Sequence, residues 1–174
     1  MIGLIAKLIV TLNSNSRPGE MASAIAFGFL LALIPGGNLL WTLLFLLAFF
    51  LKHNMGSFFL SLLLFRLITP LFDPLLNNIG SFILELSNLK GLFTFLYNLP
   101  LLSYTHFNNT IVMGALAAGL VLWIPVFLLF KSLVKLYRKK LAPKIADSKL
   151  VKALKKIPLL SKITKAVSKL SFAV

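Results

Sequence analysis

Long apolar runs broken by proline and glycine dominate the first 130 residues of the chain. The pattern predicts a helix from Pro18 to about Ile34, a break at Pro35-Gly36-Gly37 and a second helix from Leu39 to about Leu51. These arms of ~16 and ~13 residues would measure about 24 and 20 Å, less than the ~30 Å hydrocarbon core of a bilayer. Since Arg17 and Lys52 mark their outer ends, we expect a re-entrant hairpin that returns to the same membrane face.

A second unit repeats this plan. Residues 57–69 are apolar apart from Arg66, Pro70 then interrupts the run, and Asp73-Pro74 restarts a helix that reaches about Leu86. Lys90 follows. Two successive Pro-interrupted hairpins resemble the broken helices of transporter folds.

One stretch is long enough to cross a membrane without interruption. Ile111–Phe130 holds 20 residues and no charge, which is the length that a transmembrane helix needs. Thirteen of the eighteen Lys and Arg residues follow it, between Lys131 and Lys169, with Asp147 as the only acid. Positive charge stays on the cytoplasmic side, so we expect a multi-pass membrane protein whose C-terminus is cytoplasmic.

The basic tail contains an internal repeat. Ser148–Ile157 aligns without gaps with Ser161–Leu170, and in both units apolar residues and lysines take opposite helical faces. Helices of this kind lie in a membrane interface, where each lysine near an anionic surface contributes ~1 kcal/mol. The alternatives are a tail that only fixes topology and a tail that docks on a partner protein. The predicted contacts to anionic lipid head groups are Lys149, Lys152, Lys155, Lys156, Lys162, Lys165 and Lys169.

Composition supports the membrane assignment. The chain is 59% hydrophobic and 13% charged, whereas soluble domains are ~45–50% apolar and about a quarter charged. We therefore expect an all-α integral membrane protein with an N-terminal short helix and loop (1–16), a membrane-embedded helical domain (17–130) and a basic amphipathic tail (131–174). The net charge of +14 is interleaved with apolar residues beside a membrane span, so we expect lipid partners and no nucleic acid.

Catalytic chemistry has few candidates. The chain has four acids, two histidines and no cysteine, and the histidines have no partner at metal-ligand spacing. Phosphate-binding loops and nucleophile motifs are absent from the sequence. We expect no metal, no cofactor and no enzymatic activity. The weaker alternative, an enzyme that acts on lipid, would need Asp73, Glu85 or a histidine to converge on one site.

Five residues form a candidate intramembrane polar site. A helix start at Asn38, exposed at membrane depth, could bind an anionic head group, and the other interpretation is a plain hairpin turn with a cap. Asp73 near Arg66 could form a functional ion pair, or could cap a helix at the interface. The site residues are Gly36, Gly37, Asn38, Arg66 and Asp73.

A family resemblance runs through the first half of the chain. The segment 17–75 resembles the opening of a bacterial membrane domain of unknown function, number twenty sixty-two, and departs from it at 67–71, where Leu-Ile-Thr-Pro-Leu stands in place of an Asn-Pro stretch. The later segments 107–110 and 137–140 look like a longer-tailed branch of that family, which implies a larger envelope protein as partner. The residues that carry the resemblance are Pro18, Ala24, Ala26, Gly28, Ile34-Pro35-Gly36, Leu39-Leu40 and Lys52-His53-Asn54.

These observations give two functional hypotheses. The first is a non-enzymatic inner-membrane subunit or anchor of a bacterial envelope assembly, with lipid handling as the suggested context. The second is a small transporter or lipid scramblase built on the interrupted hairpins.

Overall fold

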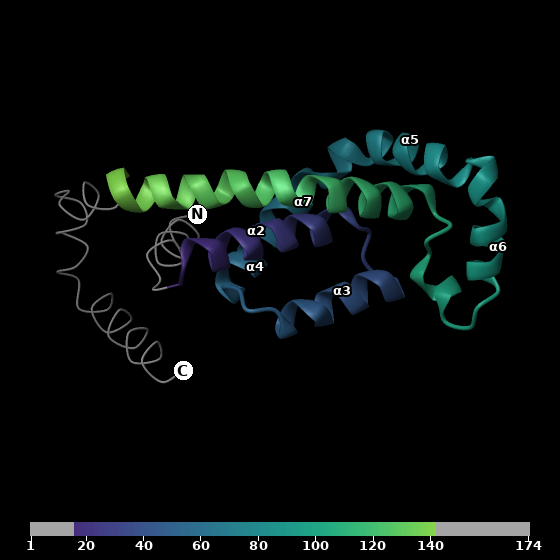
Figure 1. Cartoon of the computed structure of the whole chain (residues 1–174), viewed down its shortest axis with the longest axis horizontal. Helices are drawn as coiled ribbons and strands as arrows, with labels where there is room; N and C mark the ends of the chain where they lie inside the picture. The colour runs from purple at the N-terminus through teal and green to yellow at the C-terminus, as the bar shows by residue number, and fades with distance from the viewer. Residues whose placement is uncertain (1–15, 142–174) are drawn as a thin grey trace. The chain divides into compact units, whose positions relative to one another are not determined.

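The computed structural model describes residues 16–141, in which every regular element is helical (Figure 1). The predictions for residues 1–15 and for the tail from residue 142 onward, including the expected lipid contacts of its lysines, lie outside the described residues. The elements are α2 (Pro18–Leu33), α3 (Leu39–Phe50), α4 (Met55–Ile68), η1 (Thr69–Phe72), α5 (Asp73–Leu84), η2 (Ser87–Leu89), α6 (Lys90–Tyr97), η3 (Leu102–Thr105), α7 (Thr110–Leu136) and η4 (Tyr137–Leu141).

Residues Ser16–Lys131 form one compact unit, and the chain from Ser132 onward belongs to another. In the described part of that second unit, α7 continues as a helix to Leu136 and the π-helical turn η4 follows. All packing described below lies within Ser16–Lys131.

α2 is the buried helix of this unit. Ten of its 16 residues are buried, whereas α3 buries only Ala48. Small residues let the neighbouring helix approach closely: a Cβ added to Gly28 would lie 2.8 Å from the carbonyl oxygen of Phe58 in α4. A helix that is apolar all round and enclosed by other helices needs no polar face, which explains why its amphipathic pattern is weak.

The helices around α2 carry apolar side chains on their outer surfaces. Two helical runs, Met55–Leu84 and Thr110–Lys140, are long and apolar enough to cross a membrane, and only 22% of the most apolar window of each is buried. Soluble proteins rarely expose large contiguous apolar surfaces, so lipid is the environment that suits these helices. The outward-facing residues include Leu43, Leu46, Leu47, Phe50, Leu63, Leu64, Leu67, Val121, Ile124 and Leu128.

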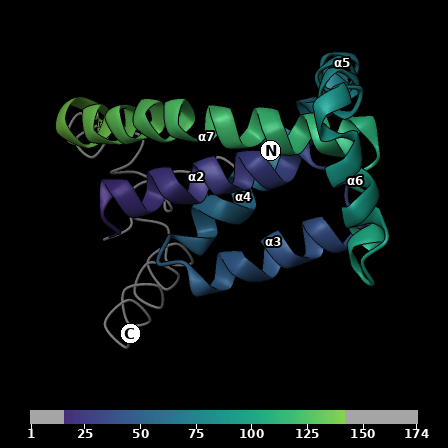
Figure 2. The ribbon, with the colours of Figure 1, turned by 45° about the vertical axis from the view of Figure 1, so that its right-hand side comes forward.

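The first break reverses the chain. Gly37 has φ +89°, a left-handed conformation that glycine adopts without a steric penalty. The Asn38 carboxamide then accepts a hydrogen bond from Trp41 N–H (2.8 Å) and donates one to the Pro35 carbonyl (2.7 Å). α3 consequently runs back along α2 (Figure 1, Figure 2), and both helices begin and end within one residue of the predicted positions.

The second break differs from the expected hairpin. Ile68, Thr69, Phe72 and Asp73 all keep right-handed helical dihedrals around Pro70. Proline removes a backbone donor and kinks a helix, but a reversal also needs extended or left-handed residues, and none stands between α4 and α5. The run Met55–Leu84 therefore continues through a kink at η1, and it is not a pair of antiparallel arms.

Glycines bring α5 and α7 into backbone contact. A Cβ on Gly80 would lie 2.9 Å from the Gly114 nitrogen and would collide with the Thr110 carbonyl, while a Cβ on Gly114 would collide with the Leu76 carbonyl. At the same crossing the Thr110 hydroxyl donates a hydrogen bond to the Asn77 side-chain oxygen. Small residues at such crossings are typical of helix packing in lipid.

Contacts along α7 give the axial position of the other helices. α2 and α7 are antiparallel (Figure 1, Figure 2), and the backbone of Gly119 lies against the Leu30 side chain. Arg17 precedes Leu30 by 13 residues and Lys131 follows Gly119 by 12, or about 20 and 18 Å. These two residues therefore share one level.

The unit has two ends, one with basic residues and one with loops. Asn54 hydrogen-bonds Ser16 (2.7 Å) and the Glu20 carbonyl (3.3 Å), so the α3–α4 turn with Lys52 lies at the level of Arg17 and Lys131. We call this level the basic end. The opposite level, where α5 meets the first turn of α7 and where α6 and η3 lie, is the loop end (Figure 2).

We predict opposite effects of alanine at two kinds of helical glycine. Gly80→Ala and Gly114→Ala should lower the melting temperature in detergent, because overpacking at the α5–α7 crossing costs ~1–3 kcal/mol. Gly91→Ala in α6 has open space around its Cβ and should stabilise by up to ~1 kcal/mol through helix propensity. A stabilising effect at Gly80 or Gly114 would contradict the close crossing.

Candidate functional site

The candidate site is built on the C-terminal end of α2. The last carbonyls of a helix have no partner within the helix, and an unpaired carbonyl in an apolar setting costs several kcal/mol. The indole Nε1 of Trp41, in the first turn of α3, donates a hydrogen bond to the Leu31 carbonyl (3.1 Å). The turn at Asn38 positions this indole because it starts α3 directly after the end of α2.

Arg66 and Thr69 complete this cap from the end of α4. Arg66 Nη1 donates to the carbonyls of Ala32 (2.9 Å) and Ile34 (3.1 Å). The Thr69 hydroxyl lies 3.0 Å from the Ala32 carbonyl and 2.9 Å from the Phe65 carbonyl. A cation at a helix C-terminus also interacts favourably with the helix dipole. We call Trp41, Arg66 and Thr69 the α2 cap.

A pocket of about 320 Å³ lies beside the cap. Its walls are mostly apolar, and its charged group is Arg66, whose side chain is exposed. A guanidinium has five N–H donors, and only Nη1 of Arg66 donates to the Ala32 and Ile34 carbonyls. The Nε and Nη2 donors have no protein acceptor among residues 16–141. The Arg66 pocket is lined by Gly36, Trp41, Phe59, Leu62, Leu63 and Arg66.

Asp73 does not join this site. The sequence allowed an Arg66–Asp73 pair, but within the described range Arg66 bonds backbone carbonyls and makes no ion pair with Asp73. Asp73 is also not the N-cap of α5, since Phe72 holds that position and no side-chain cap bond forms. The reason is the helical path through η1, which places Asp73 inside a continuing helix and not at a fresh start.

The three turn residues have separate roles. Gly36 is exposed and lines the Arg66 pocket, whereas Gly37 supplies the left-handed dihedral of the turn. Asn38 is 5% exposed and uses its carboxamide to cap α3 and to bind Pro35. The structure thus brings Gly36 and Arg66 together and leaves Asn38 with a capping role.

The sequence did not predict the capping roles of Trp41 and Thr69. Trp41 caps the carbonyl of Leu31, 10 residues earlier in the chain. Thr69 caps the carbonyl of Ala32, 37 residues earlier. A tryptophan in an otherwise aliphatic helix start and a threonine just before Pro70 were the available signals. Neither signal names its acceptor, because the acceptor depends on how α3 and α4 pack on α2.

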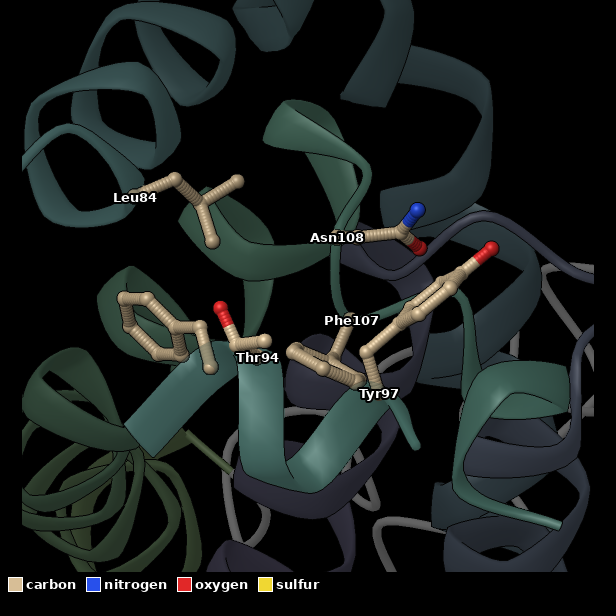
Figure 3. A pocket seen from close by; sticks show the side chains of 6 residues that line it. Leu84, Thr94, Tyr97, Phe107 and Asn108 are labelled. Carbon is tan, nitrogen blue, oxygen red and sulfur yellow. The ribbon is translucent and has the colours of Figure 1, made fainter. Parts of the chain in front are cut away.

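A second pocket of about 320 Å³ lies at the loop end, among α5, α6 and the segment before α7 (Figure 3). The rings of Phe93 and Phe107 approach to 6.3 Å. The Thr94 hydroxyl donates a hydrogen bond to the Lys90 carbonyl (2.9 Å). The other polar side chains that line the pocket are those of Tyr97 and Asn108. This aromatic pocket holds no charged group among its lining residues.

His53 lies at the basic end, in the α3–α4 turn. Its ring stacks on Phe58 at 5.7 Å and also contacts Phe27 at 5.8 Å. Burial lowers the pKa of His53, partly offset by a backbone hydrogen bond at Ala48, so the imidazole is neutral at pH 7. It lies at the opposite end of α2 from Arg66, which separates it from the candidate site.

We predict that the indole N–H of Trp41 matters for stability and that of Trp123 does not. Trp41→Phe keeps an aromatic ring beside Phe45, on which Trp41 stacks at 5.0 Å, but leaves the Leu31 carbonyl unpaired at a cost of ~1–3 kcal/mol. Trp123→Phe keeps the corresponding stack on Phe127 and removes no recorded hydrogen bond. Thermal unfolding in detergent should show a lower melting temperature for the first variant. Equal melting temperatures would contradict the cap.

Comparison with known proteins finds a relative that matches nearly the whole chain. No family model matches the chain and no solved structure matches it, so the resemblance to the domain of unknown function stays a prediction. An uncharacterised protein of Treponema pallidum (strain Nichols) is 36% identical over 159 residues, which cover 91% of this chain and 98% of the relative. At that identity and coverage, the chain belongs to the same protein family as this Treponema pallidum protein.

Proposed function

We propose that this protein is a non-enzymatic subunit or anchor of a bacterial envelope assembly, embedded in the inner membrane. The observation that carries the proposal is an apolar exterior around a buried, capped α2. Such a unit is stable where its outer side chains meet lipid. The re-entrant interpretation of α2 and α3 belongs to this proposal, because neither arm matches the thickness of the hydrocarbon core.

The use of polar side chains supports a structural role. Asn38, Trp41, Asn54, Arg66 and Thr69 all bind backbone groups within the unit. In the described range, no three residues of the His, Asp or Glu type gather into one group. A metal ion held by protein side chains needs such a group.

Charge asymmetry supports the proposed orientation. Three cationic residues, Arg17, Lys52 and Lys131, lie at the basic end. At the loop end, Glu85 follows α5 and Lys90 begins α6. Positively charged flanks remain in the cytoplasm. The basic end and the C-terminus are therefore proposed to be cytoplasmic, and α6 with η3 periplasmic.

The loop end is the proposed place for a protein partner. Phe95, Tyr97 and Tyr104 are 61%, 52% and 65% exposed there, and aromatic residues are enriched in protein interfaces. A larger envelope protein, as the family resemblance implies, would cover this aromatic surface.

The alternative function is a small transporter or lipid scramblase. The Arg66 pocket favours it, because transporters form substrate sites at broken helices and ionisable side chains within a membrane mark substrate pathways. Under this alternative, transport should be measurable in proteoliposomes without any partner.

Purification of the full chain from its native membrane in mild detergent tests the two functions. We expect a second protein to co-purify reproducibly, and we expect Phe95→Asp with Tyr104→Asp to reduce its recovery without reducing recovery of the chain. Ser87→Asp with Asn88→Asp, exposed in η2 at the same loop end, is the matched control for added charge. Recovery as a lone monomer, together with lipid or solute flux in proteoliposomes, would replace the anchor function by the alternative.

A further inference from the structure

We propose that the Arg66 pocket binds one phospholipid with an anionic head group, taken from the leaflet at the loop end. The proposal rests on the membrane embedding proposed above and specifies what occupies this pocket. Five observations carry it: the unused donors of Arg66, the lack of a carboxylate in the pocket lining, the depth of the guanidinium, the direction of the apolar wall and the open space at Gly36.

Among residues 16–141, no carboxylate neutralises the charge of Arg66. Backbone carbonyls accept two bonds from Nη1, but no carboxylate lines the pocket. A charged side chain within a membrane span is costly and pairs with another group where it can. A phosphate fits the remaining Nε and Nη2 donors, because guanidinium and phosphate form bidentate, charge-assisted hydrogen bonds.

The guanidinium lies at the depth where a lipid phosphate can reach it. It bonds the Ile34 carbonyl, and the Ile34 side chain shares a core cluster with Val112 and Ala115 of α7. Ala115 is four residues, or about 6 Å, inside the apolar stretch that starts at Ile111. Arg66 is therefore about one helical turn below the membrane boundary at the loop end.

The apolar wall extends in the direction that an acyl chain takes. α4 runs from the basic end toward the loop end, so Leu63 and Phe59 lie about 4 and 10 Å deeper in the bilayer than Arg66. Leu62, Leu63 and Phe59 all line the pocket. A lipid whose phosphate binds Arg66 would therefore pack its acyl chain against these side chains. Its head group would face the membrane boundary and its chain would extend toward the bilayer centre.

The exposed glycine at the tip leaves room for the head group. A Cβ on Gly36 would meet nothing within 4 Å, so the space above Arg66 is open on this side. With no carboxylate in the pocket lining to attract an amine, the site favours a net anionic head group over a zwitterionic one.

Quenching of Trp41 fluorescence by brominated phosphatidylglycerol tests the proposal. The chain has two tryptophans, so a Trp123→Phe background makes Trp41, which lines the pocket, the single reporter. Titration of the detergent-solubilised full chain should give saturable quenching. Brominated phosphatidylcholine should need about tenfold more lipid, and inorganic phosphate should not compete.

Two variants and two controls separate binding from folding. Arg66→Gln should raise the half-saturating lipid concentration about tenfold, and Gly36→Leu should block the pocket without touching the cap. Gly19→Leu, whose Cβ also has open space but which lies at the basic end, should bind as the parent does. Gly80→Ala should lower the melting temperature, since it overpacks the α5–α7 crossing, while leaving quenching unchanged.

Each outcome has a definite consequence. A rise in the half-saturating concentration for Arg66→Gln and loss of saturable quenching for Gly36→Leu, with both control variants binding as the parent does, support the lipid site. Non-saturable quenching, or equal quenching in all four variants, overturns it, and displacement by inorganic phosphate would identify a free-anion site instead. The assay needs neither a partner nor a membrane orientation, so its failure leaves the anchor function standing, and failure of the co-purification leaves the lipid site standing.

Discussion

The end of α2 places a constraint on the rest of the unit. A helix that stops inside an apolar environment leaves carbonyl groups that must find donors. Here Trp41 from α3, together with Arg66 and Thr69 from the end of α4, supplies them. The constraint explains why α3 must turn back at Asn38, and why a cation is present in an otherwise apolar run. The pocket beside Arg66 follows from the same arrangement.

Small residues make this arrangement compact. Gly28 lets α4 approach α2, and the Gly80–Gly114 pair lets α5 approach α7. In lipid, close packing of this kind replaces the hydrophobic effect as the force between helices. Polar groups inside the unit are consequently used as helix caps, and we propose a lipid phosphate as the partner of the remaining donors of Arg66.

The sequence predicted the helices better than their contacts. Proline, glycine and asparagine around residues 35–38 act locally, so the first break could be located within one residue. Pro70 was assigned the same role, but a proline within right-handed dihedrals only kinks a helix, and the dihedrals are decided by packing. Arg66 was identified from its apolar neighbours, whereas its acceptors on α2 lie more than 30 residues away and no local pattern encodes them.

The sidedness of the α2–α3 hairpin is the most direct test of the account. The chain has no cysteine, so the single substitutions Gly36→Cys, Asn54→Cys, Asn108→Cys and Ile145→Cys can be labelled in intact cells and in inverted membranes. We predict that an impermeant maleimide reaches the thiols of Asn54→Cys and Ile145→Cys only from the cytoplasmic side. The thiol of Asn108→Cys should react only from the periplasm. That of Gly36→Cys, about one helical turn inside the loop-end boundary and beneath a lipid head group, should be shielded from both sides. Labelling of Gly36→Cys from the periplasm would replace the re-entrant hairpin by two full crossings, and opposite sidedness of Asn54→Cys and Ile145→Cys would contradict the proposed orientation altogether.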